Sequence, residues 1–297
     1  MSGANPSRRI PDAGWRLEGL RPFQPYNYFL YLIQWMRLTL CMLRKLTVGI
    51  LLVACCWLAA CAGEPFYFVQ ISDAHFGSDD HFERGREAVK QITALPMDIA
   101  FVVMTGDIFD DNITDADVVD QVFQTLEPLA VPIHFLPGNH DILEENIAET
   151  VAAYTNAFGP LITSAEYNGV QCVFVYTEPL TEEVVIPGYD PLVELELLLE
   201  KKETLVFHHT PSVDSFYNGK AHAGWGRMAA GPRWVDLLNR YDIKAVIAGH
   251  FHRDELHRLG DVPLYVAPPL SSRFGRQGSF RIYEYRDGRL SYWTCYL

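Results

Sequence analysis

Short apolar runs alternate with amphipathic segments between residues 66 and 158. The apolar runs are rich in β-branched and aromatic residues, which favour buried strands. These runs comprise residues 66–72, 99–104 and 131–136. Between them, apolar residues recur at the spacing of a helix that buries one face. The predicted helices comprise residues 82–95, 117–129 and 142–158. Strand and helix in alternation predict an α/β fold.

The second half of the chain is richer in strands than in helices. The predicted strands comprise residues 170–177, 204–207, 243–248, 262–267, 279–285 and 290–296. Helices are predicted at 191–202 and 234–241, and loops at 178–190 and 212–231. No internal repeat or low-complexity linker interrupts residues 62–297. We therefore expect one domain over this range, built on two sheets with helices outside.

Polar clusters follow five of the predicted strands directly. They are D-x-H at 73–75, G-D-x-x-D at 106–110, G-N-H-D at 138–141, H-H-x-P at 208–211 and G-H-x-H at 249–252. Alternate residues of an extended segment face the same way, so His250 and His252 can point into one site. Carboxylate and imidazole together suit ions such as Mn, Fe and Zn. A site with two ions also needs a group that bridges them, which a carboxylate does readily.

The charge of the chain argues against a nucleic-acid partner. The formal net charge is −13, and residues 1–60 hold seven basic and two acidic residues. The remainder holds 17 basic and 35 acidic residues, a balance of −18. Non-specific binding to nucleic acid needs a basic surface, so we expect no such binding and argue against a nuclease. Apolar residues make up 49% of the chain, enough for a sizeable core.

The five clusters, in this order, resemble the motifs of the calcineurin-like metallophosphoesterase superfamily over residues 66–297. The resemblance implies a four-layer αββα sandwich of two mixed sheets flanked by helices. It makes Asp107 the carboxylate that bridges two divalent or trivalent metal ions (Mn, Fe or Zn). It assigns Asp73, His75 and His252 to one ion, and Asn139, His209 and His250 to the other. Counting from the strand end favours His208 instead of His209, whereas the family pattern, with the ligand two residues before Pro211, favours His209.

The resemblance also implies a catalytic role for two residues of the third cluster. His140 would contact the phosphate and protonate the leaving oxygen. Asp141 would orient the His140 ring, as a carboxylate commonly does for a working imidazole; the alternative is that Asp141 caps the helix expected at 142–158. Two ions about 3.5–4 Å apart would lower the pKa of a bound water, and the metal-bound hydroxide would attack phosphorus.

Three departures from related motifs point to one branch of the superfamily. Its protein Ser/Thr phosphatases carry Arg-Gly after the second motif's Asp and Glu after the third motif's His, where this chain has Asp111-Asn112 and Asp141. Its purple acid phosphatases carry a Tyr three residues after the bridging Asp, where this chain has Asp110. The pattern is most similar to the cyclic-nucleotide phosphodiesterase-like branch. We expect a phosphodiesterase or phosphomonoesterase; the alternative is a non-catalytic lipoprotein that binds metal or a phosphorylated ligand.

The N-terminal residues are typical of an export signal. A basic start at Arg44 and Lys45 precedes an apolar run too short for a membrane span, which ends in Leu58-Ala59-Ala60-Cys61. This ending resembles a bacterial lipobox, so we expect a signal peptide at 36–61 and a lipid on Cys61 that holds the exported protein at a membrane. A plain signal peptide or an anchor helix is the alternative. Residues 1–35 lie upstream of the signal, so we expect translation to start at Met36 or Met42.

Overall fold

The computed structural model describes residues 29–30, 32–40, 42–45, 64–78, 80–181, 184–217, 220–222 and 224–297. The chain divides into two units, Met1–Cys61 and Ala62–Leu297. In the first unit, residues 29–30, 32–40 and 42–45 are helical. None of the helices within the described ranges is both long and apolar enough to cross a membrane. The lipobox and the lipidation site predicted at Cys61 lie outside the described residues.

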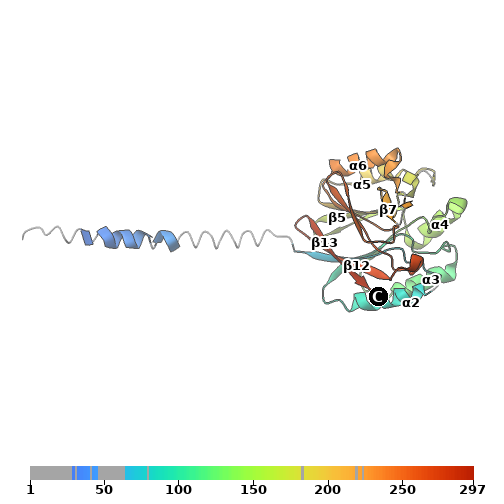
Figure 1. Cartoon of the computed structure of the whole chain (residues 1–297), viewed down its shortest axis with the longest axis horizontal. Coiled ribbons are helices and arrows are strands. Elements are labelled where there is room, and N and C mark those ends of the chain that lie inside the picture. The colour runs from blue at the N-terminus through green and yellow to red at the C-terminus, as the bar shows by residue number, and fades with distance from the viewer. Residues whose placement is uncertain are drawn as a thin grey trace, which may run out of the picture. The chain divides into compact units, whose positions relative to one another are not determined.

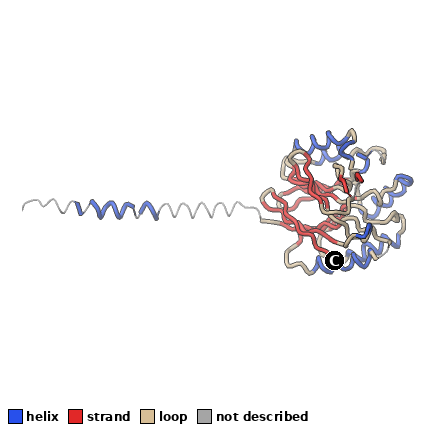
Figure 2. Tube along the Cα trace, in the orientation of Figure 1, coloured by secondary structure: helices blue, strands red, loops and turns tan. Residues whose placement is uncertain are grey.

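Two mixed sheets form the centre of the second unit (Figures 1 and 2). The first sheet has the strand order β13-β12-β1-β2-β3. Its strands are β1 (Phe66–Ile71), β2 (Ile99–Thr105), β3 (Ile133–Leu136), β12 (Ser279–Arg286) and β13 (Arg289–Tyr296). β1, β2 and β3 are parallel, whereas β12 and β13 are antiparallel to their neighbours.

The second sheet has the order β10-β11-β9-β6-β5-β4. Its strands are β4 (Ile162–Tyr167), β5 (Val170–Val175), β6 (Thr204–Phe207), β9 (Ile243–Ala248), β10 (Glu255–Leu259) and β11 (Val262–Val266). The four inner strands are parallel, and the edge strands β4 and β10 are antiparallel. A separate hairpin pairs β7 (Ser215–Tyr217) with β8 (Lys220–His222). β4, β10 and the hairpin were not predicted, because their sequences lack a continuous apolar run.

Helices cover the outer faces of both sheets. In Figure 1, α5 and α6 lie on one side of the strands, and α2 and α3 lie on the other. The helices are α2 (His81–Thr93), α3 (Ala116–Leu126), α4 (Ile147–Phe158), α5 (Pro191–Leu198) and α6 (Ala230–Arg240). Short 3-10 turns are η1 (Glu144–Asn146), η2 (Glu178–Thr181), η3 (Trp225–Arg227) and η4 (Arg273–Gly275). Asp115 and Asp190 cap α3 and α5, because each side chain accepts hydrogen bonds from free backbone N–H groups of the first turn.

Three apolar layers hold this arrangement together. An aromatic layer lies between the sheets, where Phe68 stacks on Phe101 with ring centres 4.8 Å apart and meets the edge of Phe207 at 5.5 Å. Each fully buried Phe contributes about 1.5–3 kcal/mol relative to an exposed one. A second layer packs α2, α3 and α4 on the first sheet, and a third packs α5 and α6 on the second. The αββα sandwich of two mixed sheets predicted from the sequence is therefore confirmed.

One smaller expectation has a clear outcome. α4 begins at Ile147, not near residue 142, because a turn at 138–142 and η1 precede it. Cys172 and Cys295 are free thiols; Cys172 is buried between the sheets, and Cys295 is half-buried near the α2–α4 layer.

Candidate metal centre

The five polar clusters lie at the carboxyl ends of parallel strands from both sheets. β1 leads to Asp73 and His75, β2 to Asp107, β3 to Asn139, β6 to His208 and His209, and β9 to His250 and His252. Main-chain hydrogen bonds join these loops: Asp73 N–H donates to Gly106 O (3.1 Å), and Gly249 N–H donates to His209 O (3.1 Å). Carboxyl ends of parallel strands are where open α/β sheets place their ligands.

Five of the predicted ligand residues have a left-handed backbone conformation. Their φ angles lie between 47° and 70°. They are Asp73, His75, Asp107, His250 and His252. Residues other than glycine rarely adopt this conformation, and it costs on the order of 1–3 kcal/mol per residue. Such strain concentrates at functional sites, where the surrounding structure holds side chains in a required direction.

Glycines in the same loops provide the space that these side chains occupy. A Cβ atom on Gly138 would overlap the Asp107 carboxylate, and one on Gly106 would overlap the His209 ring. A Cβ on Gly249 would meet Ser72 Oγ. The glycine of each G-D, G-N-H and G-H motif is therefore explained by close approach to a site residue.

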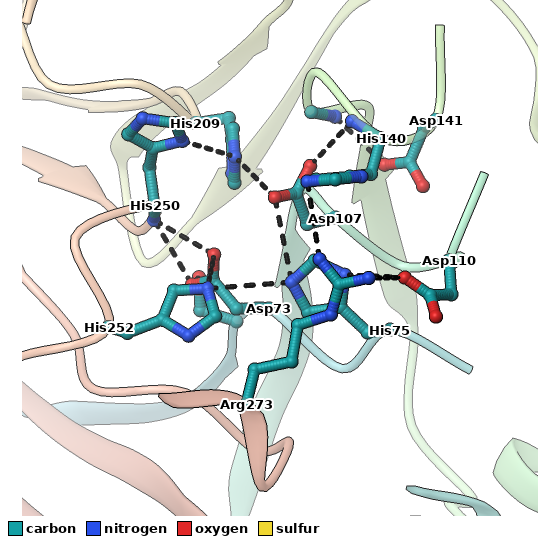
Figure 3. A network of polar contacts seen from close by, with 12 residues as sticks. Asp73, His75, Asp107, Asp110, His140, Asp141, His209, His250, His252 and Arg273 are labelled. Carbon is teal, nitrogen blue, oxygen red and sulfur yellow. Dashed lines mark hydrogen bonds and ion pairs between the residues drawn. The ribbon is translucent and has the colours of Figure 1, made fainter. Parts of the chain in front are cut away.

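The first side-chain cluster contains Asp73, His75, Asp107 and His252, all buried (Figure 3). Their candidate ligand atoms lie within 4.8 Å of one another. His252 Nε2 is 3.2 Å from Asp73 Oδ1 and 3.4 Å from His75 Nε2. Two ring nitrogens and two carboxylates that converge in this way form a donor set for a transition-metal ion.

The second cluster contains Asp107, His209 and His250. His209 Nε2 is 3.2 Å from Asp107 Oδ2 and 3.3 Å from His250 Nδ1. His209 Nδ1 lies 2.8 Å from Thr105 O, to which it donates, so Nε2 is left to face the cluster. The two clusters share Asp107.

Asn139 lies in the loop that follows β3. Its Oδ1 atom is buried and has no hydrogen-bond partner among the described residues. An unpaired buried amide oxygen costs free energy, and a cation within reach would remove that cost. The next residue along the chain, His140, donates its backbone N–H to Asp107 Oδ1 at 2.9 Å. Asn139 therefore lies one residue from a direct contact with the shared carboxylate.

Adjacent histidines 208 and 209 have different surroundings. His209 belongs to the second cluster, whereas His208 is buried against the edges of Trp225 and Trp234. Burial, followed by the charge of His209, lowers the pKa of His208 to about 3, so its ring is neutral. Trp225 is also buried and donates its indole N–H to Thr210 O. Both side chains pack in the interior.

The carboxylate that contacts the His140 ring is Asp111, not Asp141. His140 Nδ1 is 2.6 Å from Asp111 Oδ1. Asp141 instead accepts hydrogen bonds from the backbone N–H groups of Gly138 (2.8 Å), Phe109 (2.8 Å) and Ile108 (3.2 Å). The expectation that Asp141 orients His140 is therefore wrong, and so is the alternative of a helix cap, since Asn146 occupies that position of α4. Asp141 ties the β2 loop to the β3 loop.

Burial and neighbouring charges shift the pKa values of the cluster in opposite directions. Burial would raise the pKa of Asp73, but His252 outweighs it and the pKa falls to about 2. Burial lowers the pKa of His75 to about 3 and that of His250 to about 4, which leaves neutral rings with a free electron pair. Burial opposes a charged His209, yet Asp107 holds the pKa of His209 well above its usual range. A cation beside Asp107 would compete with that proton.

Comparison with known proteins identifies the family. The family model for calcineurin-like phosphoesterase matches residues 66–254. This chain belongs to the calcineurin-like phosphoesterases. A protein named probable cyclic nucleotide phosphodiesterase from Colwellia psychrerythraea is 29% identical over 260 residues, which cover 77% of this chain and 94% of that protein. The serine/threonine-protein phosphatase CPPED1 of Danio rerio is 22% identical over 228 residues, covering 64% of this chain and 71% of that protein.

A solved structure shares the fold of this calcineurin-like phosphoesterase. The crystal structure of a dimetal phosphatase from Danio rerio superimposes with a TM-score of 0.52 and 15% sequence identity. The match covers 78% of this chain and 99% of that protein. Calcineurin-like phosphoesterases are metal-dependent, and the residues here fit metal ions: the clusters combine carboxylates with neutral imidazoles, and Asn139 Oδ1 is buried without a partner.

Sequence motifs did not reveal every residue at the centre of this phosphoesterase. Arg273, from η4, forms an ion pair with Asp110, and its Nη1 lies 3.4 Å from His140 Nε2 (Figure 3). His75, Asp110 and His140 form a third group whose candidate ligand atoms lie within 4.8 Å of one another. Asp111 directly follows the second motif, and this position is the signal in the sequence for a partner of His140. Arg273 lies 21 residues after His252 and has no motif around it.

Proposed function

We propose that this calcineurin-like phosphoesterase binds two metal ions, bridged by Asp107, and uses them to hydrolyse a phosphate ester. One observation carries the proposal: two groups of convergent carboxylates and imidazoles have Asp107 in common. Asp73, His75 and His252 would hold one ion, and Asn139, His209 and His250 the other. When bound, the two ions supply Lewis-acid chemistry that activates water and offsets the charge of the phosphate.

The protein's own residues would then hold the substrate and move protons. His140 Nδ1 pairs with Asp111, which leaves Nε2 directed toward the centre. Burial opposes the charged ring, but Asp107 and Asp111 outweigh it and raise the pKa of His140. A raised pKa keeps a proton available near neutral pH, so His140 is the candidate donor to the leaving oxygen. Asp141 keeps the Asp107 and Asn139 loops together through its three backbone hydrogen bonds.

A phosphodiester is our preferred substrate class. Support comes from the name of the Colwellia relative and from Asp111, which occupies the place of an arginine in the Ser/Thr phosphatases of the superfamily. Metal analysis and hydrolysis of bis-p-nitrophenyl phosphate by Mn²⁺-loaded protein test the proposal, with p-nitrophenyl phosphate as the monoester comparison. Two bound ions per chain and faster diester turnover are expected. Metal binding without turnover of either compound would favour the non-catalytic binding protein.

We also propose that the protein is exported and held at a bacterial membrane by a lipid on Cys61. The support is the sequence alone: a basic start, an apolar run and Leu58-Ala59-Ala60-Cys61. Expression of the full chain in a bacterium with labelled palmitate tests it, with Cys61→Ser as the matched variant. We expect label in the membrane fraction for the wild type and none for the variant. Equal labelling of both, or of neither, would contradict the proposal.

A further inference from the structure

The loop after β11 is tied to the first cluster through its main chain. Leu270 N–H donates to Ser72 O at 2.8 Å, and Ser271 N–H donates to Asp73 O at 3.1 Å. Ser272 N–H then donates to His81 Nε2 at 3.3 Å, and the same ring places Nδ1 2.6 Å from His75 O. The two residues that follow, Arg273 and Phe274, therefore start from a backbone position fixed relative to Asp73 and His75.

Arg273 extends into the candidate metal centre. Among the described residues, its guanidinium contacts Asp110 and, through Nη1 at 3.4 Å, His140 Nε2. The side chain keeps about a quarter of its surface exposed, so solvent reaches it. Arginine carries five N–H donors in a planar fork that matches phosphate geometry, and the ion pair with Asp110 leaves donors over. Arg273 and His140 Nε2 thus meet at the candidate metal centre from different loops.

Phe274, the next residue, is an exposed aromatic side chain beside the first cluster. Its side chain is 81% exposed, and its ring centre lies 5.1 Å from that of His252 in an edge-on arrangement. A single exposed phenylalanine is ordinary on a protein surface. This one has a φ of 56°, a costly conformation for a bulky residue. An exposed ring held in a strained backbone next to a candidate ligand indicates a function other than packing.

We propose that Arg273 and Phe274 together recognise the substrate of this centre. Arg273 contacts a non-bridging phosphate oxygen beside His140, and the Phe274 ring stacks on a flat ring in the ester group. The preferred substrates are therefore phosphate esters of aryl or nucleoside alcohols. This inference rests on the proposed phosphoesterase function. It places specificity in η4 (Arg273–Gly275).

The two residues make separable contributions, and the full-length Mn²⁺-loaded protein can test each. Inorganic phosphate, measured by calorimetry and as a competitive inhibitor, reports the Arg273 contact. For Arg273→Gln we expect affinity for phosphate to fall about tenfold or more, because a charge-assisted hydrogen bond is lost. Arg273→Lys keeps the positive charge but lacks the planar guanidinium, so its affinity for phosphate should lie between those of the wild type and Arg273→Gln. Arg86→Gln, exposed on α2, is the control and should match the wild type.

Aryl substrates report the Phe274 contact. For Phe274→Leu we expect the KM for bis-p-nitrophenyl phosphate to rise about fivefold or more, within the range of base–aromatic stacking, with phosphate affinity unchanged. Phe274→Trp keeps an aromatic ring and should have the wild-type KM. Trp293→Leu removes another exposed aromatic side chain, on β13, and should have no effect.

The outcomes separate this inference from the function on which it rests. The inference would be overturned if Arg273→Gln bound phosphate as tightly as the wild type, or if Phe274→Leu kept the wild-type KM. The proposed function would still stand if the wild type were active. An inactive wild type would overturn the proposed function, and calorimetry with phosphate would still decide the role of Arg273.

Discussion

The two clusters that share Asp107 differ in charge. The first has Asp73 and two imidazoles besides the shared carboxylate, whereas the second has two imidazoles, to which the proposed ligand assignment adds the neutral amide of Asn139. An ion in the first cluster would be more fully neutralised. An ion in the second would keep more positive charge, bind less tightly and act as the stronger Lewis acid. The difference suggests a division of labour between an anchoring ion and an activating ion.

The largest expected effect comes from the residue that the clusters share. Asp107→Asn removes the bridging charge from both, so we expect phosphodiesterase activity to fall by more than about 100-fold, beyond what loss of a supporting residue costs. Metal content, measured by mass spectrometry, should drop below one ion per chain. Asp120→Asn, on the exposed face of α3, provides the control. Full activity with two retained ions would show that the clusters are independent.

A matched pair of histidine variants separates the second cluster from the core beside it. His209→Leu should lower activity about 10- to 100-fold and reduce metal content, with the first cluster unaffected. His208→Leu replaces a neutral buried ring with an apolar side chain of similar volume, and should change the free energy of unfolding by less than about 1.5 kcal/mol. Its metal content should match the wild type. Metal loss in His208→Leu alone would reverse the assignment.

Gradual chelation tests the charge difference directly. During titration with EDTA, the second cluster should release its ion first, with an affinity at least about tenfold weaker, because a carboxylate near a cation contributes on the order of a few kcal/mol. Activity should disappear with that first ion. Asn139→Asp gives the second cluster the same number of carboxylates as the first. Both ions should then be released at the same EDTA concentration. Simultaneous release in the wild type would contradict the division of labour.

The smallest effect concerns an aromatic neighbour of the first cluster. Phe274→Gly should relieve the left-handed backbone and stabilise the protein by about 1 kcal/mol, raising Tm by about 2–4 °C. Phe274→Ala removes the same ring but keeps the strained conformation, so it serves as the control. Calorimetric unfolding of both variants isolates the backbone contribution. Equal stability of the two would mean that Phe274 carries no such strain.

The sequence predicted site residues where polar side chains directly follow a strand. His250 and His252 come straight after the apolar run of β9, so both their convergence and the strand were visible from the residue pattern. Arg273 was not visible, because its position depends on main-chain bonds from Leu270 and Ser271 to the β1 loop. Edge strands such as β4 escaped prediction because one face is solvated and the apolar pattern is weak.

The partner of His140 was missed for a related reason. Sequence proximity favoured Asp141, but three backbone N–H groups compete for that carboxylate and hold it away from the ring. Which carboxylate contacts His140 depends on hydrogen bonds between loops that are distant in sequence. His208 and His209 posed the same problem, and there the family pattern favoured the residue that the structure places in the cluster.

The left-handed residues around Asp107 have a consequence for how the protein acquires metal. Their directions are maintained by hydrogen bonds that need no cation, such as those from His250 N–H to the Asp73 carboxylate and from His75 N–H to Asp107 O. The energetic cost of ordering the ligands is therefore met during folding. Under the proposed assignment, bound ions would exchange with the surrounding pool while the protein stays folded, and the metal carried in a cell would follow the supply in its environment.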